Sequence, residues 1–393
     1  MRNITSKAEV VVIGGGITGL STAYQLAKQG VDVILLEQNE LASGATGANN
    51  GMCGPTDETT VRGRWHQIYK NLEKELNYDI DYKDSPDIIV YTSENKKEME
   101  KLGIWSYYEP KMNQVDEIFE IEPLLSRDII GGITSNRKYV NPWKLSYAFA
   151  INIKKYGGNI YTHTKVNNVK VINNEISEVI TNKGRIKIDC VVNAAGAWSS
   201  EIGKMLGINI PVVPKKGHIL ITEHTPKPCP YHGRIANEFF LTKYPYNFSP
   251  EAINSNDLNI KLGIAALIHY DPVNENYSIG GSHEYSGFDS SINPRVVKYI
   301  SQHCIKIVPE LRNLNIIRIF TGFRPYCYID GEPIFSKVDN IDGFLIATGT
   351  NGIGLNLGPM AGKIMSELVL EKRLSLDIEK YSYSRFYQYG IGK

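Results

Sequence analysis

Residues 11–30 read VVIGGGITGLSTAYQLAKQG, in which three consecutive glycines separate a β-branched apolar run from a stretch rich in alanine and leucine. The run at 9–13, EVVVI, predicts a short buried strand. After the glycines, Leu20 and Ala27 belong to an apolar set at helical spacing, and Gly30 is a candidate for the residue that ends the helix. The stretch therefore predicts a strand, a tight turn and a helix in immediate succession.

A second apolar run, VDVILLE, follows and ends on Glu37, which completes a strand, helix and strand unit. In Gly14-x-Gly16-x-x-Gly19, the first glycine suits the tight turn, the second lets backbone N–H groups approach a pyrophosphate, and the third lets the helix pack on the strand. Glu37 lies 23 positions after Gly14, where a carboxylate accepts hydrogen bonds from a ribose hydroxyl. The unit predicts a dinucleotide site but does not choose between NAD and FAD.

Length and charge narrow the class of protein. A chain of 393 residues with 42% apolar residues is too long for one ordinary compact domain and predicts two. The 43 Lys and Arg residues nearly balance the 42 Asp and Glu residues, so no strong electrostatic field favours nucleic acid or an anionic membrane. We expect a small-molecule partner and no nucleic acid.

The sequence shows no signal for export or metal binding. Residues 1–15 lack the apolar core of a signal peptide, and no run of about 18 apolar residues would form a transmembrane segment. The five cysteines are dispersed and form no C-x-x-C pair, which fits a reducing cytoplasm. His224, Cys229 and His232 lack a fourth ligand, so we expect no metal site. The expected protein is cytoplasmic and has no transmembrane segment.

Residues 41–54, LASGATGANNGMCG, form a run of small residues directly after the predicted dinucleotide unit. Such a run is unsuited to a core element and able to wrap closely around a ligand. The alternative is a flexible surface loop. Its place a few positions after Glu37 favours a loop that covers the rest of a long cofactor.

The sequence from 11 to 47 resembles the opening of the FAD-dependent D-amino-acid oxidase superfamily, which contains glycine oxidase, sarcosine oxidase and flavin-dependent proline dehydrogenases. Two later segments are similar to that family as well: IDCVVNAAGAWSSEIGKMLG at 188–207 and DGFLIATGTNGIGLNLGPMAGKIMSELV at 342–369. One departure is Thr350, where many relatives have histidine. The resemblance spans nearly the whole chain. It implies an α/β fold, with a Rossmann-type FAD-binding domain and a second substrate domain built on a mainly antiparallel sheet.

The resemblance also implies FAD as the cofactor. Some sarcosine oxidases attach the flavin through a cysteine, but the spacing of Cys327 to Asp330 does not match theirs, so we expect FAD to be bound non-covalently. The expected cofactor-binding residues are Gly14, Gly16, Ile17, Thr18, Gly19, Glu37, Gln38, Ser43, Gly44, Ala45, Thr46, Asn50, Gly51, Met52, Val166, Ala195, Gly196, Trp198, Gly349, Thr350, Asn351, Gly352, Ile353 and Gly354.

Segments typical of a cofactor domain occur at both ends and in the middle of the chain, so the two domains are expected to interleave. Runs at 86–93, 275–283 and VPKKGHILITEH predict strands of an antiparallel sheet, and 141–158 predicts a helix. The segment 225–262 is a candidate lid or an ordinary connector. The expected ranges are 1–84, 141–215 and 321–393 for the FAD-binding domain, and 85–140 and 216–320 for the substrate domain.

The resemblance implies an enzyme that oxidises the C–N bond of a small amino acid by hydride transfer to the flavin, which gives an imino acid. Glycine, sarcosine, proline, hydroxyproline and D-amino acids are the candidate substrates. Arg324, in TGFRPYCYIDGEPIF, matches the arginine that holds the substrate carboxylate in glycine oxidase and its relatives, and a guanidinium suits that role because it binds a carboxylate bidentately. The alternative for Arg324 is a surface pair with Asp330 or Glu332.

Other side chains are less firmly assigned. In the family, tyrosine hydroxyls often bind the substrate carboxylate together with the arginine. Tyr326 is the catalytic candidate that we retain on this basis. The pair Lys215 and Lys216 is typical of a solvated turn, although the family carries a basic residue near the flavin at that point. Further tyrosine candidates are Tyr244, Tyr246 and Tyr270.

Two other activities remain open. The first is an FAD-dependent dehydrogenase of a 2-hydroxy acid such as 2-hydroxyglutarate, in which His218 or His283 would take the hydroxyl proton. The second is a subunit of an amino-acid dehydrogenase complex that passes electrons to a partner, whose iron–sulfur centre would lie in another polypeptide because this chain has no cysteine cluster. A homo-oligomer or an electron-accepting partner subunit is compatible with the sequence.

Overall fold

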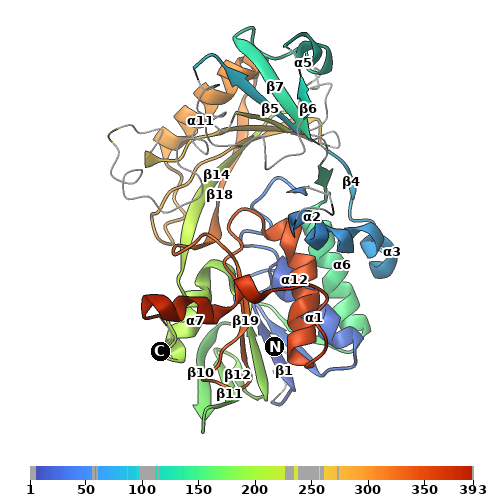
Figure 1. Cartoon of the computed structure of the whole chain (residues 1–393), viewed down its shortest axis with the longest axis vertical. Helices are drawn as coiled ribbons and strands as arrows, with labels where there is room; N and C mark the ends of the chain where they lie inside the picture. The colour runs from blue at the N-terminus through green and yellow to red at the C-terminus, as the bar shows by residue number, and fades with distance from the viewer. Residues whose placement is uncertain are drawn as a thin grey trace.

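A computed structural model of the chain describes residues 6–54, 58, 61–85, 87–94, 96, 111–113, 115–135, 137–225, 234–237, 256, 261–271 and 274–391. Two large sheets dominate it. Figure 1 places the six-stranded sheet and its helices in the lower half, and the eight-stranded sheet in the upper half. The predicted combination of a Rossmann-type sheet with a mainly antiparallel sheet is confirmed.

The six-stranded sheet contains the predicted dinucleotide unit. Its inner strands are fully buried apolar runs, as expected of parallel strands that are covered on both faces. All neighbours pair in parallel except the β19 and β20 pair. In spatial order the strands are β19 Ile334–Lys337, β20 Phe344–Thr348, β13 Cys190–Asn193, β1 Val10–Ile13, β2 Val33–Leu36 and β9 Asn159–Tyr161.

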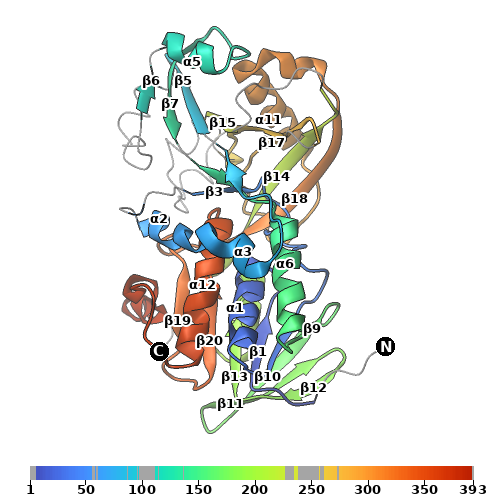
Figure 2. The ribbon, with the colours of Figure 1, turned by 90° about the vertical axis from the view of Figure 1, so that its right-hand side faces the viewer.

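Three helices cover one face of this sheet, as Figure 2 shows: α1 Ile17–Lys28, α6 Pro142–Lys155 and α12 Gly354–Val369. Asn141 caps α6 by accepting hydrogen bonds from two backbone N–H groups of its first turn. Helices α1 and α12 approach closely, because a Cβ at Gly362 would lie 2.3 Å from the Ser21 Oγ atom. On the other face lie α7 Ser199–Met205 and the small sheet β10 Val166–Ile172, β11 Glu175–Thr181 and β12 Gly184–Lys187.

The eight-stranded sheet includes the predicted strands at 86–93 and 275–283, which become β5 and β17. Apart from the parallel pair β15 and β5, its neighbours run antiparallel. In spatial order its strands are β18 Ile316–Cys327, β14 Val212–Thr222, β17 Asn276–Gly280, β16 Ala266–Asp271, β15 Arg234–Asn237, β5 Asp87–Thr92, β7 Ile129–Ser135 and β6 Lys111–Asn113.

Smaller elements complete the described chain. Helix α11, Pro294–Ile307, packs its apolar residues against the eight-stranded sheet, and α5, Val115–Ile121, packs near β7. The short strands β3 Met52–Cys53, β8 Lys138–Tyr139 and β4 Lys83–Asp84 form a separate sheet. Helices α2 Val61–His66 and α3 Leu72–Leu76 follow the small-residue loop. No helix in the described ranges is long and apolar enough to cross a bilayer.

The strands β14 and β18 connect the two halves. They form a long antiparallel ladder that runs from the eight-stranded sheet down to the six-stranded half (Figure 1). The domain boundaries predicted between 215 and 216, and between 320 and 321, fall inside these two strands. The division of the chain into two domains therefore stays a prediction.

Candidate cofactor and substrate site

A long cavity extends from the carboxyl ends of β1 and β2 to the inner face of the eight-stranded sheet. The glycine turn forms one end of it. Gly14 has a φ of +115°, and a Cβ there would lie 2.3 Å from the Ala194 carbonyl oxygen. At Gly19 a Cβ would lie 2.0 Å from the Gly14 carbonyl oxygen. Both positions require glycine, so this end of the cavity has the bare backbone that a bound pyrophosphate needs.

Polar groups beside the turn are already ordered. The Ile17 N–H at the start of α1 donates to the Thr46 hydroxyl, at 3.0 Å. One Glu37 carboxylate oxygen accepts from the Gly15 N–H and the other from the Asn39 N–H, both at 2.7 Å. A carboxylate has about four acceptor sites, so these bonds leave Glu37 able to accept from a ribose hydroxyl. The turn and its acid fit the adenosine part of FAD.

Most of the predicted cofactor residues line this one cavity, although their contacts with FAD stay predictions. Four do not line it, and each has a backbone role: Gly19 lies under the turn, Gly51 and Gly349 adopt positive φ, and Ile353 precedes α12. The lining set is Gly14, Gly16, Ile17, Thr18, Glu37, Gln38, Ser43, Gly44, Ala45, Thr46, Asn50, Met52, Val166, Ala195, Gly196, Trp198, Thr350, Asn351, Gly352 and Gly354.

The C-terminal glycine turn meets the other half of the molecule. Its Asn351 N–H donates to the Pro325 carbonyl oxygen at 2.8 Å, and Thr350 forms an isolated β-bridge with Tyr326. A Cβ at Gly352 would lie 3.9 Å from the Arg324 side chain. The turn leads into α12, whose N-terminus carries partial positive charge. Arg324 and this helix end therefore flank the same part of the cavity.

Arg324 lines the cavity on β18, directly opposite Lys215 on β14. Its guanidinium lies over Gly217, where a Cβ would approach Nη1 to 2.4 Å. The Nη1 group donates to the Ser282 carbonyl oxygen at 2.9 Å, which fixes the orientation of the fork. The alternative of a surface pair is wrong, because Asp330 bonds Arg385 at 2.7 Å and Glu332 lies 3.8 Å from Lys380.

The expectation that Lys215 and Lys216 are solvated is also wrong. Lys215 is 1% exposed and Lys216 is 2% exposed, because both lie within β14 and alternate between its faces. Lys215 does not itself line the cavity but lies on the same face of the ladder as Arg324, and its Nζ atom lies 4.1 Å from the centre of the Tyr326 ring. Burial, together with the Arg324 charge, holds the pKa of Lys215 well below its usual range.

Two further residues extend this cluster. His283 lines the cavity, and burial together with the charges of Arg324 and Lys215 holds its pKa well below the usual range, so its imidazole is neutral. The Tyr285 ring lies 5.9 Å from the Tyr326 ring, and burial beside Tyr326 raises the Tyr285 pKa. The sequence analysis missed Tyr285, because the position after a glycine-rich strand end gives no signal for a site.

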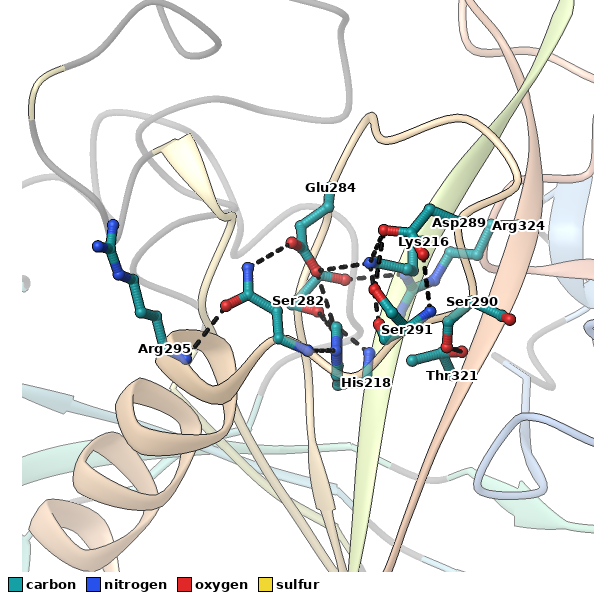
Figure 3. A network of polar contacts seen from close by, with 11 residues as sticks. Lys216, His218, Ser282, Glu284, Asp289, Ser290, Ser291, Arg295, Thr321 and Arg324 are labelled. Atoms are coloured by element: carbon teal, nitrogen blue, oxygen red, sulfur yellow. Dashed lines mark hydrogen bonds and ion pairs between the residues drawn. The ribbon is translucent and has the colours of Figure 1, made fainter.

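The opposite face of β14 carries a polar network that Figure 3 shows. His218 is fully buried, and its Nδ1 atom lies 3.0 Å from the Ser282 hydroxyl and 3.2 Å from the Glu284 carboxylate. The Asn293 N–H donates to His218 Nε2 at 3.1 Å, so Nε2 carries no proton and Nδ1 does. Both ring nitrogens therefore have hydrogen-bond partners, although His218 is among the residues that line the cavity. These bonds leave neither ring nitrogen free for a substrate proton, and the role of His218 as a proton acceptor stays a prediction.

Lys216 belongs to the same network. Its ammonium donates to the Ser291 carbonyl oxygen at 3.2 Å and lies 3.8 Å from Asp289 and 4.0 Å from Glu284. Asn293 donates to the second Glu284 oxygen at 3.0 Å. The network thus surrounds Ser282, whose carbonyl holds Arg324 (Figure 3). It links a buried charge pair on one face of β14 to the guanidinium on the other.

The remaining candidates lie elsewhere. Tyr326 is 1% exposed and sits beneath Lys215, not on the cavity wall. Tyr270 packs against Tyr277 in the core. The Cys327 thiol donates to Asp330 at 3.3 Å, and burial raises its pKa to about 12. His224 pairs with Glu275, no metal-ligand cluster occurs within the described ranges, and Cys229, His232, Tyr244 and Tyr246 lie outside them.

Comparisons with known proteins agree with this geometry. Glycine oxidase from Bacillus subtilis (strain 168) is 26% identical over 385 residues, which cover 94% of this chain and 95% of that protein. The crystal structure of L-proline dehydrogenase from P. horikoshii superimposes on this structure with a TM-score of 0.81. The two chains are 26% identical, and the match covers 99% of this chain and 100% of that one.

A third relative is longer. Mitochondrial dimethylglycine dehydrogenase from Mus musculus is 25% identical over 402 residues, which are 97% of this chain and 44% of that protein. This chain thus spans less than half the length of that relative. The profile of the family described as FAD dependent oxidoreductase (DAO) matches residues 9–368. The chain therefore belongs to the DAO family of FAD-dependent oxidoreductases, and it is an enzyme whose cofactor is FAD.

Proposed function

We propose that this enzyme oxidises the C–N bond of a small amino acid, with transfer of a hydride from the α-carbon and formation of an imino acid. The observation that carries the proposal is the Arg324 guanidinium, oriented over Gly217 beside the C-terminal glycine turn. A guanidinium fork in a cavity binds a carboxylate in two parallel hydrogen bonds and so fixes its direction. The names of the relatives, which are a glycine oxidase, a proline dehydrogenase and a dimethylglycine dehydrogenase, support an amino-acid substrate.

The residues around the cavity fit FAD. The Gly14 turn and the α1 N-terminus would hold the pyrophosphate, Glu37 would hold the ribose, and the loop at 41–54 would cover the middle. The turn before α12 would lie by the ring system. When bound, FAD supplies the two-electron acceptor that no side chain provides. The protein supplies the orientation of the substrate.

The charges near Arg324 also suit an amine substrate. An amine must be unprotonated before its neighbouring C–H bond can lose a hydride. Arg324 and the helix end place positive charge near the amine, which disfavours the ammonium form. The neutral His283 imidazole on the cavity wall adds no further charge. We infer that the site binds the substrate carboxylate tightly and keeps its amine neutral.

A second candidate function is oxidation of a 2-hydroxy acid. His283 is the residue that would serve it as a base, because it lies on the cavity wall, but the low pKa that burial and the two nearby cations impose makes it a weak proton acceptor. In that reaction Arg324 would hold the same carboxylate. The two candidate substrates differ in the atom bound to the reacting carbon, which is nitrogen in an amino acid and oxygen in a hydroxy acid.

An anaerobic titration of the flavin absorbance separates them. The purified holoenzyme is titrated with glycine, sarcosine, L- and D-proline, hydroxyproline, D-alanine and 2-hydroxyglutarate. Loss of the oxidised flavin spectrum with an amino acid supports the proposal. Loss with 2-hydroxyglutarate alone would replace it by the second candidate. His283→Asn is the matched variant, since it should slow hydroxy-acid oxidation far more than amine oxidation.

A further inference from the structure

Lys215 is a buried lysine with no carboxylate beside it in the described part of the chain. It is 1% exposed and lies on the same face of the β14 and β18 ladder as the cavity-lining Gly217 and Arg324. Within the described chain its ammonium has the Tyr326 ring as a neighbour, at 4.1 Å, but no hydrogen bond or carboxylate. The neighbouring Lys216 differs in this respect, because its ammonium lies near two carboxylates, those of Glu284 and Asp289.

A buried ammonium without an anionic partner is costly, and a second cation beside it adds repulsion. One substrate carboxylate at Arg324 would balance only one of the two charges. A ring face such as that of Tyr326 attracts a cation but does not neutralise it. Loss of the Lys215 proton relieves this cost in the free protein, and an anionic group of a ligand beside Lys215 would favour the charged form and pair with it.

We propose that the substrate carries two acidic groups: Arg324 holds the carboxylate on the reacting carbon, and Lys215 holds a second carboxylate of the same molecule. The substrate class is an amino or imino acid with two carboxylates. Arg324 and Lys215 face each other across the ladder, where opposite Cβ atoms lie about 5 Å apart. Their heads diverge along the strands, since Arg324 extends over Gly217 and Lys215 over Tyr326. This inference rests on the amine oxidation proposed above for its chemistry but not for its binding.

Matched substrate pairs test it. Iminodiacetate differs from sarcosine, and D-aspartate from D-alanine, by one carboxylate. The holoenzyme is reduced anaerobically with each, and the dissociation constant is taken from the dependence of the reduction rate on concentration. We expect the dicarboxylic member of at least one pair to bind ten or more times tighter, since a desolvated charge pair has that effect or a larger one.

Variants then assign the preference to its residue. Lys215→Met should reduce the ratio between the two members of the pair to about one, and Lys215→Arg should restore part of it. Lys337→Met removes a half-exposed lysine at a distance from the site and should leave the ratio unchanged. Thermal unfolding and flavin content show whether each variant is folded and loaded. If Lys215→Met does not fold, Lys215→Gln replaces it in the comparison.

Binding of unreactive acids separates this inference from the proposed function. Malonate and succinate are compared with acetate and propionate by calorimetry and by their perturbation of the flavin spectrum. A dicarboxylate preference that Lys215→Met abolishes supports the inference, even if no amino acid reduces the flavin. An equal affinity for both classes in the parent enzyme would overturn it. An equal loss for both classes in Lys215→Met would also overturn it, and would assign Lys215 to the flavin or to the fold.

Discussion

Replacement of Arg324 by lysine keeps a positive charge in the cavity but removes the planar fork above Gly217. Lysine offers a single ammonium, so one of the two parallel bonds to a substrate carboxylate is lost. The Ser282 carbonyl oxygen, which accepts from Nη1 at 2.9 Å, also loses its guanidinium donor. We expect the cofactor site to be unaffected, because the Gly14 turn lies at the far end of the cavity.

The size of the effect follows from these two losses. A hydrogen bond to a charged group contributes about 1.5–3 kcal/mol, and a buried carbonyl without its donor adds about 1 kcal/mol or more. Together they predict a loss of about 2.5–4 kcal/mol in substrate binding, which raises the dissociation constant about 60- to 700-fold. Flavin content should equal that of the parent enzyme.

The assay is the same anaerobic reduction, performed over a range of substrate concentrations. Arg318→Lys is the matched control, because Arg318 lies on the same strand but is exposed. Its dissociation constant should change less than twofold. A change of under threefold for Arg324→Lys, with normal flavin content, would remove Arg324 from the carboxylate site and with it the main support for the proposed function.

Three further predictions concern the glycine turn at Gly14, the close contact between Gly217 and Arg324, and the polar network around Glu284. Gly14→Ala should yield protein with little FAD, read from the ratio of flavin to protein absorbance, whereas Gly157→Ala, which has a similar positive φ but open space, should retain it. Gly217→Ala should displace the Arg324 fork and weaken substrate binding at least tenfold without loss of FAD; an unchanged affinity would place the fork elsewhere. Burial acts to raise the pKa of Glu284, but the His218 and Asn293 hydrogen bonds and the Lys216 charge outweigh it and hold that pKa below its usual value. The Glu284 carboxylate therefore stabilises the fold above its unfolded pKa of about 4.3, and this contribution is lost as pH falls through the folded pKa. Glu284→Gln should lower the free energy of unfolding by about 1–3 kcal/mol at pH 7, and this difference should shrink on acidification; a pH-independent difference in urea unfolding would contradict the assignment.

The sequence predicted the elements whose signals are local. The strand, turn and helix around Gly14 need only neighbouring residues, and so does the helix capped by Asn141. Arg324 was found through its motif, and the structure places it on the cavity wall. These features share one property, because each depends on fewer than about forty consecutive residues.

The errors concern side chains whose surroundings come from distant segments. The sequence predicted that Lys215 and Lys216 are solvated, because lysine is rarely buried. Their burial depends on contacts with β18 and with residues 284–291, which are distant in the sequence. The sequence also does not show that the ring nitrogens of His218 are already bonded, because the partners Ser282 and Asn293 lie more than sixty positions away. Period-two alternation shows that neighbours on a strand face opposite ways, but it does not show which face borders the cavity.

The ladder of β14 and β18 has one consequence for how the chain tolerates change. Gly217 on β14 shares one face of this ladder with Gly322 and Arg324 on β18, and all three line the cavity, whereas Leu220 belongs to the apolar cluster that includes α11. An insertion or deletion of one residue in either strand would exchange the two faces beyond the point of change. In β14, such a change before Gly217 would turn Gly217 away from the Arg324 guanidinium. Insertions and deletions that preserve the chemistry must therefore lie in the loops between strands, because the ladder itself tolerates substitutions but no change in length.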